Sequence, residues 1–213
     1  MVRQERAVVT RQQILMAAAE RFDEAGYERA SLSEIVDQSG VTKGALYFHF
    51  KSKDDLATVV IEEQHAISMR AVAAILESDA PALEQVVMFS HEMAREIVED
   101  PIVRAGIRLT LEASAEVGPP QPYLDWIEAC ERTFRKAIEE GDVLDTVDPA
   151  ELARYFVGAF TGVQLVANVL TQRSDLAERL DQMFGFLLPS IVPPRRRHKI
   201  DRFRHARWAS ATA

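Results

Sequence analysis

Lys43 and Tyr47 stand four residues apart in the segment TKGALYFHF, a spacing that places both side chains on one face of a helix. Leu46 and Phe50 repeat at the same interval on the opposite face, where burial is expected. A lysine ammonium neutralises phosphate charge, and a tyrosine hydroxyl can hydrogen-bond to phosphates and base edges. The segment therefore predicts a helix with one core face and one face whose chemistry suits nucleic acid.

Four neighbouring residues add to this prediction. Gly44 and Ala45 have almost no side chain, so the helix backbone can approach base edges closely, and an alanine methyl suits a thymine methyl. Thr42 is expected to cap the helix, where its hydroxyl and the free backbone N–H groups can hold a phosphate oxygen. Lys53, at the start of the next predicted helix, is expected to be a second phosphate contact.

The element expected to position these groups is a helix-turn-helix. Ser31 and Glu34 form a capping box that starts a helix of about two turns, which ends at Ser39 and Gly40. Thr42 starts the second helix after a short turn. In such a motif the second helix lies in the major groove of DNA.

Helical periodicity extends over the rest of the chain, and no alternating strand pattern is present. The first helix is expected to start at Thr10, which forms a capping box with Gln13, and to stop at Gly26. A proline-rich loop is expected at residues 116–122, where functional groups often occur. The sequence thus predicts an all-α protein, with further helices at residues 53–77, 83–98, 101–114, 123–140, 149–170 and 175–188.

The charge is unevenly distributed along the chain, which has a formal net charge of -8. Residues 1–53 hold 8 Lys or Arg against 7 Asp or Glu, residues 54–194 hold 10 against 25, and residues 195–213 hold 7 against 1. Local charge decides phosphate contact, so an acidic body favours a single docking orientation on DNA. The basic residues that follow Pro193 and Pro194 are expected to form a flexible tail.

Composition and motif content exclude several classes of protein. No apolar run is long enough for a membrane span, and the N-terminus lacks a secretory signal, so a soluble cytoplasmic protein without membrane contact is expected. Cys130 is the single cysteine, and the five histidines are scattered, so neither a disulfide nor a metal site is predicted. No phosphate-binding loop or Ser/His/Asp arrangement is visible, which argues against a cofactor and against an enzyme.

The string FDEAGYERASLSEIVDQSGVTKGALYFHFKSKDDL resembles the DNA-binding domain of TetR-type repressors, and the match spans residues 8–56. The alternative for Tyr47, Phe48 and His49 is an aromatic core, which is less favoured for Tyr47 because its face opposes Leu46 and Phe50. The resemblance implies that the following residues contact DNA: Thr42, Lys43, Gly44, Ala45, Tyr47, Phe48, His49 and Lys53.

A narrower resemblance covers most of the chain. The segments RQERAVVTRQQIL, VRAGIRL, PYLDW and FVGAFTGVQLV together resemble the γ-butyrolactone autoregulator receptors of antibiotic-producing filamentous bacteria. The resemblance implies a repressor of antibiotic-biosynthesis genes that a diffusible lactone or butenolide, the effector, releases from DNA. It also implies that Trp126 lines the effector pocket, and that Gln64 and Thr161 hydrogen-bond a lactone carbonyl and a hydroxyl. The alternatives are that Trp126 fills the core and that Thr161 is a satisfied core threonine.

The expected organisation is a DNA-binding domain at 1–53, an effector-binding and dimerisation domain at 54–190, and the basic tail at 191–213, with the helix at 53–77 linking the domains. A homodimer is expected, because two helix-turn-helix motifs read a palindromic operator. Small residues such as Gly158 and Gly162 suggest that the helices at 149–170 and 175–188 form the interface, although an internal core would also explain them. Alternatives are a receptor-like paralogue that answers to an antibiotic or other metabolite, a helical enzyme acting on a lactone, and a DNA-binding module without a ligand.

Overall fold

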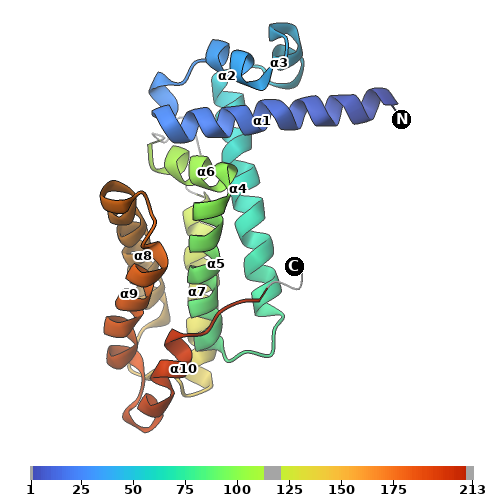
Figure 1. The fold of residues 1–213 in the computed structure, drawn as a ribbon. Coiled ribbons are helices and arrows are strands. Elements are labelled where there is room, and N and C mark those ends of the chain that lie inside the picture. The colour runs from blue at the N-terminus through green and yellow to red at the C-terminus, as the bar shows by residue number, and fades with distance from the viewer. Residues whose placement is uncertain (1, 113–120, 210–213) are drawn as a thin grey trace. The chain divides into compact units, whose positions relative to one another are not determined.

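The computed structural model describes residues 2–112 and 121–209, and every regular element in these ranges is helical, as the sequence predicted. The predicted loop at 116–122 falls largely outside the described residues. The elements are α1 (Val2–Arg29), α2 (Leu32–Ser39), α3 (Lys43–His49), α4 (Lys53–Leu76), α5 (Ala82–Glu99), α6 (Pro101–Glu112), α7 (Gln121–Glu139), α8 (Pro149–Thr171), α9 (Leu176–Ile191), the 3-10 helix η1 (Pro194–Lys199) and α10 (Ile200–Arg204). Figure 1 labels the α-helices.

The chain divides into two compact units, and their boundary differs from the predicted one at residue 53. The first unit contains the described residues up to Met69 together with α6, and the second contains Arg70–Val98 and the described residues from Gln121 onward. The physical reason is that α6 buries Ile102 and Leu109 in the same apolar core as α1. The helix α4 contributes residues to both units.

The helix α1 is longer than predicted. It begins at Val2, so Thr10 lies inside the helix and does not cap it. The stretch before Thr10 contains neither glycine nor proline, and nothing in it stops a helix. Gly26, with φ 78° and ψ 172°, interrupts the helix where the sequence predicted, because glycine tolerates this positive φ.

Two side chains of α6 hold the end of α1. The Arg104 guanidinium pairs with the Asp23 carboxylate at 2.7 Å, and the backbone N–H of Tyr27 donates to the Glu112 carboxylate at 2.9 Å. These contacts fix the turn from which the chain enters α2.

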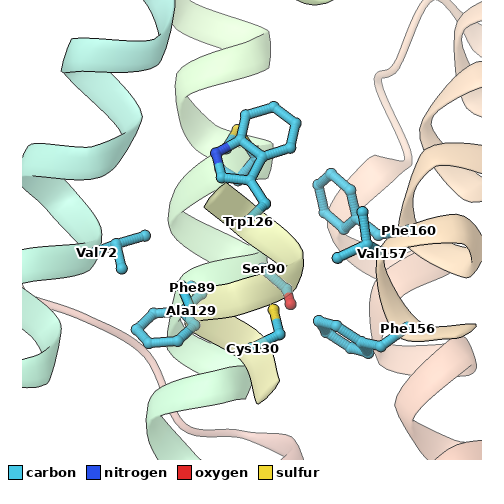
Figure 2. A pocket seen from close by; sticks show the side chains of 10 residues that line it. Val72, Phe89, Ser90, Trp126, Ala129, Cys130, Phe156, Val157 and Phe160 are labelled. Atoms are coloured by element: carbon cyan, nitrogen blue, oxygen red, sulfur yellow. The ribbon is translucent and has the colours of Figure 1, made fainter. Parts of the chain in front are cut away.

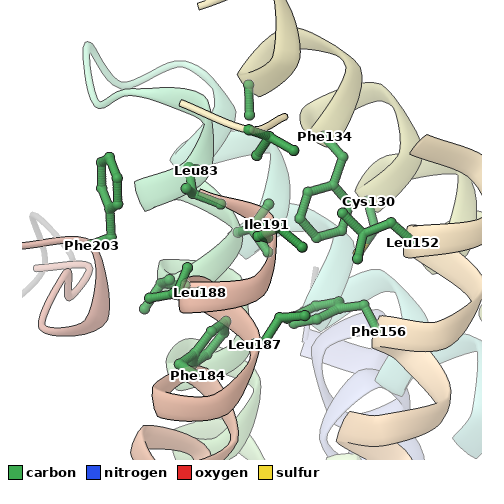
Figure 3. Packing of buried hydrophobic residues seen from close by; sticks show 14 of the residues in the cluster. Leu83, Cys130, Phe134, Leu152, Phe156, Phe184, Leu187, Leu188, Ile191 and Phe203 are labelled. Carbon is green, nitrogen blue, oxygen red and sulfur yellow. The ribbon is translucent and has the colours of Figure 1, made fainter. Parts of the chain in front are cut away.

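The core of the second unit is built from large side chains on α5, α7, α8 and α9. Phe134 of α7 meets Phe156 of α8 edge-on, with ring centroids 5.6 Å apart, and Phe156 in turn lies 5.8 Å from Phe184 of α9. Figure 3 shows these rings with Leu83 of α5 beside them. The amphipathic periodicity of the four helices therefore converges on one continuous core.

The C-terminal residues correct the expectation of a flexible tail. Residues 194–204 form η1 and α10, and Phe203 is fully buried in the core of the second unit. Arg202 pairs with Glu84 at 2.7 Å, and Lys199 pairs with Asp142 at 3.1 Å. Both carboxylates are almost completely buried and need a cationic partner, which the basic segment supplies.

Candidate nucleic-acid interface and ligand cavity

The helix-turn-helix is held by local hydrogen bonds that the sequence predicted. The Ser31 hydroxyl accepts the backbone N–H of Glu34 at 3.3 Å, and the Glu34 carboxylate accepts the backbone N–H of Ser31 at 3.1 Å, which completes the capping box. The hydrogen bonds from Ser31 and Arg21 hold the pKa of Glu34 below its ordinary value. Gly40 ends α2 at φ 68°, and its N–H donates to the Val36 carbonyl. These caps set the angle at which α3 leaves the turn.

The helix α3 has one buried and one exposed face. Leu46 and Phe50 are buried in the core of the first unit. Tyr47 is 49% exposed and Phe48 is 80% exposed, so the core interpretation of these two rings is wrong. His49 is half-buried and lies edge-on to Phe48, with centroids 5.0 Å apart. An exposed phenyl ring on a short helix is unusual in a free surface and is suited to apolar contact with a base edge.

The groups at the start of α3 are arranged for close approach. The Lys43 ammonium lies 6.0 Å from the centre of the Tyr47 ring, so the two side chains share a face as predicted. The Thr42 hydroxyl accepts the backbone N–H of Ala45 at 3.2 Å, and its own proton remains available to a phosphate. A Cβ added at Gly44 would meet only Thr42 Oγ1, at 3.9 Å. No contact within the described protein therefore requires a glycine at this position.

Lys53 is held differently from the predicted phosphate contact. Its ammonium donates to the carbonyl oxygens of Tyr27 at 2.9 Å, Ala30 at 3.2 Å and Glu28 at 3.4 Å, and it lies 4.3 Å from the centre of the Tyr27 ring. In this position Lys53 stabilises the carbonyl groups at the end of α1. Its contact with a phosphate stays a prediction.

The second unit contains a small, partly open apolar cavity of about 60 Å³. Figure 2 shows Val72 of α4 on one side, Phe160 of α8 on the other and Trp126 of α7 between them. The lining residues are Val72, Phe89, Ser90, Met93, Trp126, Ala129, Cys130, Phe156, Val157 and Phe160.

The hydrogen-bonding groups of this lining are few. The Ser90 hydroxyl donates to the Val86 carbonyl at 3.0 Å and is thereby occupied. Burial raises the pKa of the Cys130 thiol to about 12, which keeps the thiol protonated and unreactive. The Trp126 indole N–H is buried and has no partner among the described residues. The lining is almost wholly apolar, so the cavity suits an apolar ligand body.

The three predicted ligand residues do not all lie together. Trp126 lines the cavity, as the sequence predicted. Thr161 is outside the lining but in the same unit, where its hydroxyl donates to the Val157 carbonyl at 2.8 Å and lies 3.5 Å from the Tyr123 hydroxyl. Gln64 is fully buried in the other unit and its amide donates to Ser68 at 3.2 Å. Ligand contact by all three remains a prediction.

Sequence reasoning missed most of the cavity lining. On α7 the cavity is lined by positions 126, 129 and 130, and on α8 by positions 156, 157 and 160. This is the spacing of a single helix face, which the sequence pattern contains. The sequence pattern could not distinguish residues that line a cavity from residues that fill a core, because both kinds of helix face are apolar.

An exposed apolar surface runs along α8 and α9. A groove of about 650 Å³ lies there, bordered by Tyr155, Val166 and Phe186 among others. Phe186 is 85% exposed. A Cβ added at Gly158 or Gly162 would meet nothing within 4 Å, so packing inside the described chain does not explain these small residues.

Other kinds of site were sought in the described residues. In these two ranges no group of three or more His, Cys, Asp or Glu side chains could hold a metal ion. None of the described helices is both long enough and apolar enough to cross a membrane.

Two family models match this chain, over two separate ranges. The family model described as bacterial regulatory proteins, tetR family, matches residues 14–60, and the model described as tetracyclin repressor-like, C-terminal domain, matches residues 80–193. The A-factor receptor protein of Streptomyces griseus is 39% identical over 194 residues, which are 91% of this chain and 68% of that protein.

Two solved structures share the fold over nearly the whole chain. A gamma-butyrolactone receptor (ArpA-like protein) has a TM-score of 0.78 at 34% identity, covering 93% of this chain and 95% of that chain. The TetR family protein CprB of Streptomyces coelicolor, in complex with its biological operator sequence, has a TM-score of 0.77 at 35% identity, covering 92% and 94%.

Proposed function

Because the chain belongs to the TetR family of bacterial regulatory proteins, we propose that it is a repressor that binds a palindromic DNA operator as a homodimer and that a small γ-butyrolactone or butenolide releases it. The observation that carries the proposal is the presence, in one chain, of an exposed recognition face on α3 and an apolar cavity lined by Trp126. The protein would act in the cytoplasm, where the operator is.

The DNA contact is made by α3 in the major groove. Lys43 and the Thr42 hydroxyl hold phosphates, while Tyr47 and Phe48 meet base edges and thymine methyls. The absence of a side chain at Gly44 lets the start of the helix approach the bases. The fold shared with CprB, whose solved structure contains its operator, supports this docking.

The effector binds in the cavity of the second unit. A lactone ring and its alkyl chain pack on the Trp126 indole and on the apolar lining. The A-factor receptor protein and the gamma-butyrolactone receptor among the relatives support this class of ligand.

The coupling between the sites runs through α4. This helix begins at Lys53, which holds the end of α1, and its last part carries Val72 of the cavity lining. A ligand that displaces Val72 therefore shifts a helix that also belongs to the DNA-binding unit. If the effector favours the conformation that binds DNA poorly, DNA must weaken effector binding by the same coupling free energy, about 1–3 kcal/mol in typical cases.

The dimer contact is the groove along α8 and α9, and its occupant is the same face of a second copy. A two-fold contact between identical faces covers Phe186 and Tyr155 and lets the backbones approach at Gly158 and Gly162. One helix-turn-helix reads only a few base pairs, so a dimer is also what operator recognition requires.

The proposal is tested by release of the purified protein from its own promoter DNA. A panel of γ-butyrolactones and butenolides is added to the complex, and binding is followed by gel shift at fixed salt. Wild type should be released by at least one member of the panel. Trp126→Ala should bind the operator with wild-type affinity and resist release, because the substitution removes contact area in the cavity and leaves α3 unchanged. Release of the variant at the wild-type concentration would show that Trp126 only fills the core.

A further inference from the structure

Polar side chains lie beyond the lining at one end of the apolar cavity, and the antiparallel course of α7 and α8 shows which end this is. Phe134 of α7 packs on Phe156 of α8, whereas Tyr123 of α7 lies beside Thr161 of α8. The two helices are therefore antiparallel, and the start of α7 lies beside the later part of α8. The cavity lies along this pair of helices.

The next positions on the two lining faces carry polar side chains. Tyr123 precedes the lining residue Trp126 by three positions, and its ring meets the indole edge-on with centroids 5.3 Å apart. Gln164 follows the lining residue Phe160 by four positions, which is one helical turn. Tyr123, Thr161 and Gln164 lie outside the lining itself, next to its residues on α7 and α8, and we call these three residues the polar end of the cavity.

The hydrogen-bonding capacity of the polar end is incompletely used. Gln164 is only 2% exposed, and its Oε1 atom is buried without a partner among the described residues. The Thr161 proton goes to the Val157 carbonyl at 2.8 Å, so Thr161 offers other groups only an acceptor. The 3.5 Å between the Thr161 and Tyr123 hydroxyls is longer than a good O–H···O hydrogen bond. Burial raises the pKa of Tyr123, so the phenol keeps its proton as a donor.

We propose that Tyr123 and Gln164 are specificity-determining residues that bind a hydroxyl group of the effector at this end of the cavity. The inference rests on the proposed function, which places the apolar part of the effector against Trp126. A hydroxyl can accept from Tyr123 and donate to Gln164 Oε1 or Thr161 Oγ1. A ketone or ether oxygen can only accept, and a methylene can do neither. The preferred effector is therefore a lactone with an alkyl chain and a hydroxyl group, and the oxidised or deoxy forms bind less tightly.

The test compares two 2-alkyl-γ-butyrolactones that differ only by one side-chain hydroxyl, titrated calorimetrically into wild type and Tyr123→Phe. Wild type should bind the hydroxy lactone about tenfold more tightly than the deoxy lactone, because a net hydrogen bond of ordinary strength is worth about that factor. Tyr123→Phe should lose about tenfold for the hydroxy lactone and nothing for the deoxy lactone. The deoxy lactone thus serves as the internal control for cavity shape.

A second variant, Gln164→Met, has nearly the same side-chain volume and should show the same selective loss. Operator affinity and melting temperature verify that each variant is folded. Equal losses for both lactones, or no loss in either variant, would overturn the inference. If wild type bound the two lactones equally, the hydroxyl contact would be overturned and the proposed function would stand. If wild type bound neither lactone, both the hydroxyl contact and the proposed function would be overturned.

Discussion

Replacing Phe203 by alanine is expected to detach the C-terminal segment, residues 194–209, from the second unit. The ring is fully buried in the core of that unit. A Phe→Ala change in a core costs about 3–5 kcal/mol, because the lost burial is accompanied by a cavity. Because α10 has only five residues, it can detach and no cavity has to remain. The expected loss of unfolding free energy is therefore at the lower limit, about 3 kcal/mol.

The ion pairs of the C-terminal segment change the expected loss of unfolding free energy only slightly. Breaking a buried pair costs about 3–5 kcal/mol when the remaining charge stays buried. Here the detached segment also uncovers Glu84 and Asp142, which regain water when Arg202 and Lys199 leave. Most of the effect should therefore come from the ring.

Thermal unfolding followed by circular dichroism measures the effect. For a chain of this size, about 3 kcal/mol corresponds to a decrease in melting temperature of about 6–12 °C. Trypsin should also cut the basic segment faster in the variant. Arg197→Ala, which changes an exposed residue of η1, is the matched control and should unfold like wild type. If Phe203→Ala also melted at the wild-type temperature with an unchanged trypsin pattern, the packing reasoning would be refuted.

Two further predictions concern the other unit and the pH dependence of stability. Gly44→Ala should leave the free energy of unfolding unchanged or raise it by up to about 1 kcal/mol, since a helical glycine is replaced. It should weaken operator binding about tenfold in a gel shift, because the added methyl group separates α3 from the bases, and undiminished operator binding would contradict the docking. The control Gly40→Ala, at φ 68°, should instead lower the melting temperature. Burial, assisted by Arg207 and His205 and opposed by Asp181, lowers the pKa of His91 to about 4, so the folded protein keeps this ring neutral and the free energy of unfolding should fall as the pH decreases from 6.5 toward 4. Chemical denaturation of wild type and His91→Gln at pH 7.5 and pH 5 checks this, and an equal decrease in both proteins would exclude His91 as the cause.

The sequence by itself determined the features that depend on neighbours along the chain. The capping box of Ser31 with Glu34 and the positive φ of Gly40 are decided within a few residues, and so they were read correctly. The exposed face of α3 followed from the same local periodicity. The start of α1 was misplaced because the Thr10–Gln13 pair is compatible with both a cap and a helix interior.

Only the tertiary structure decided which distant residues share a core. The helix α6 packs on α1 although residues 30–100 separate the two helices in the sequence. Phe203 is buried although it stands in a segment whose composition predicts disorder. The cavity and its polar end likewise bring Tyr123 beside Thr161, 38 positions apart. Burial depends on surfaces that come from elsewhere in the chain, and a periodic pattern states which face is apolar without stating what covers it.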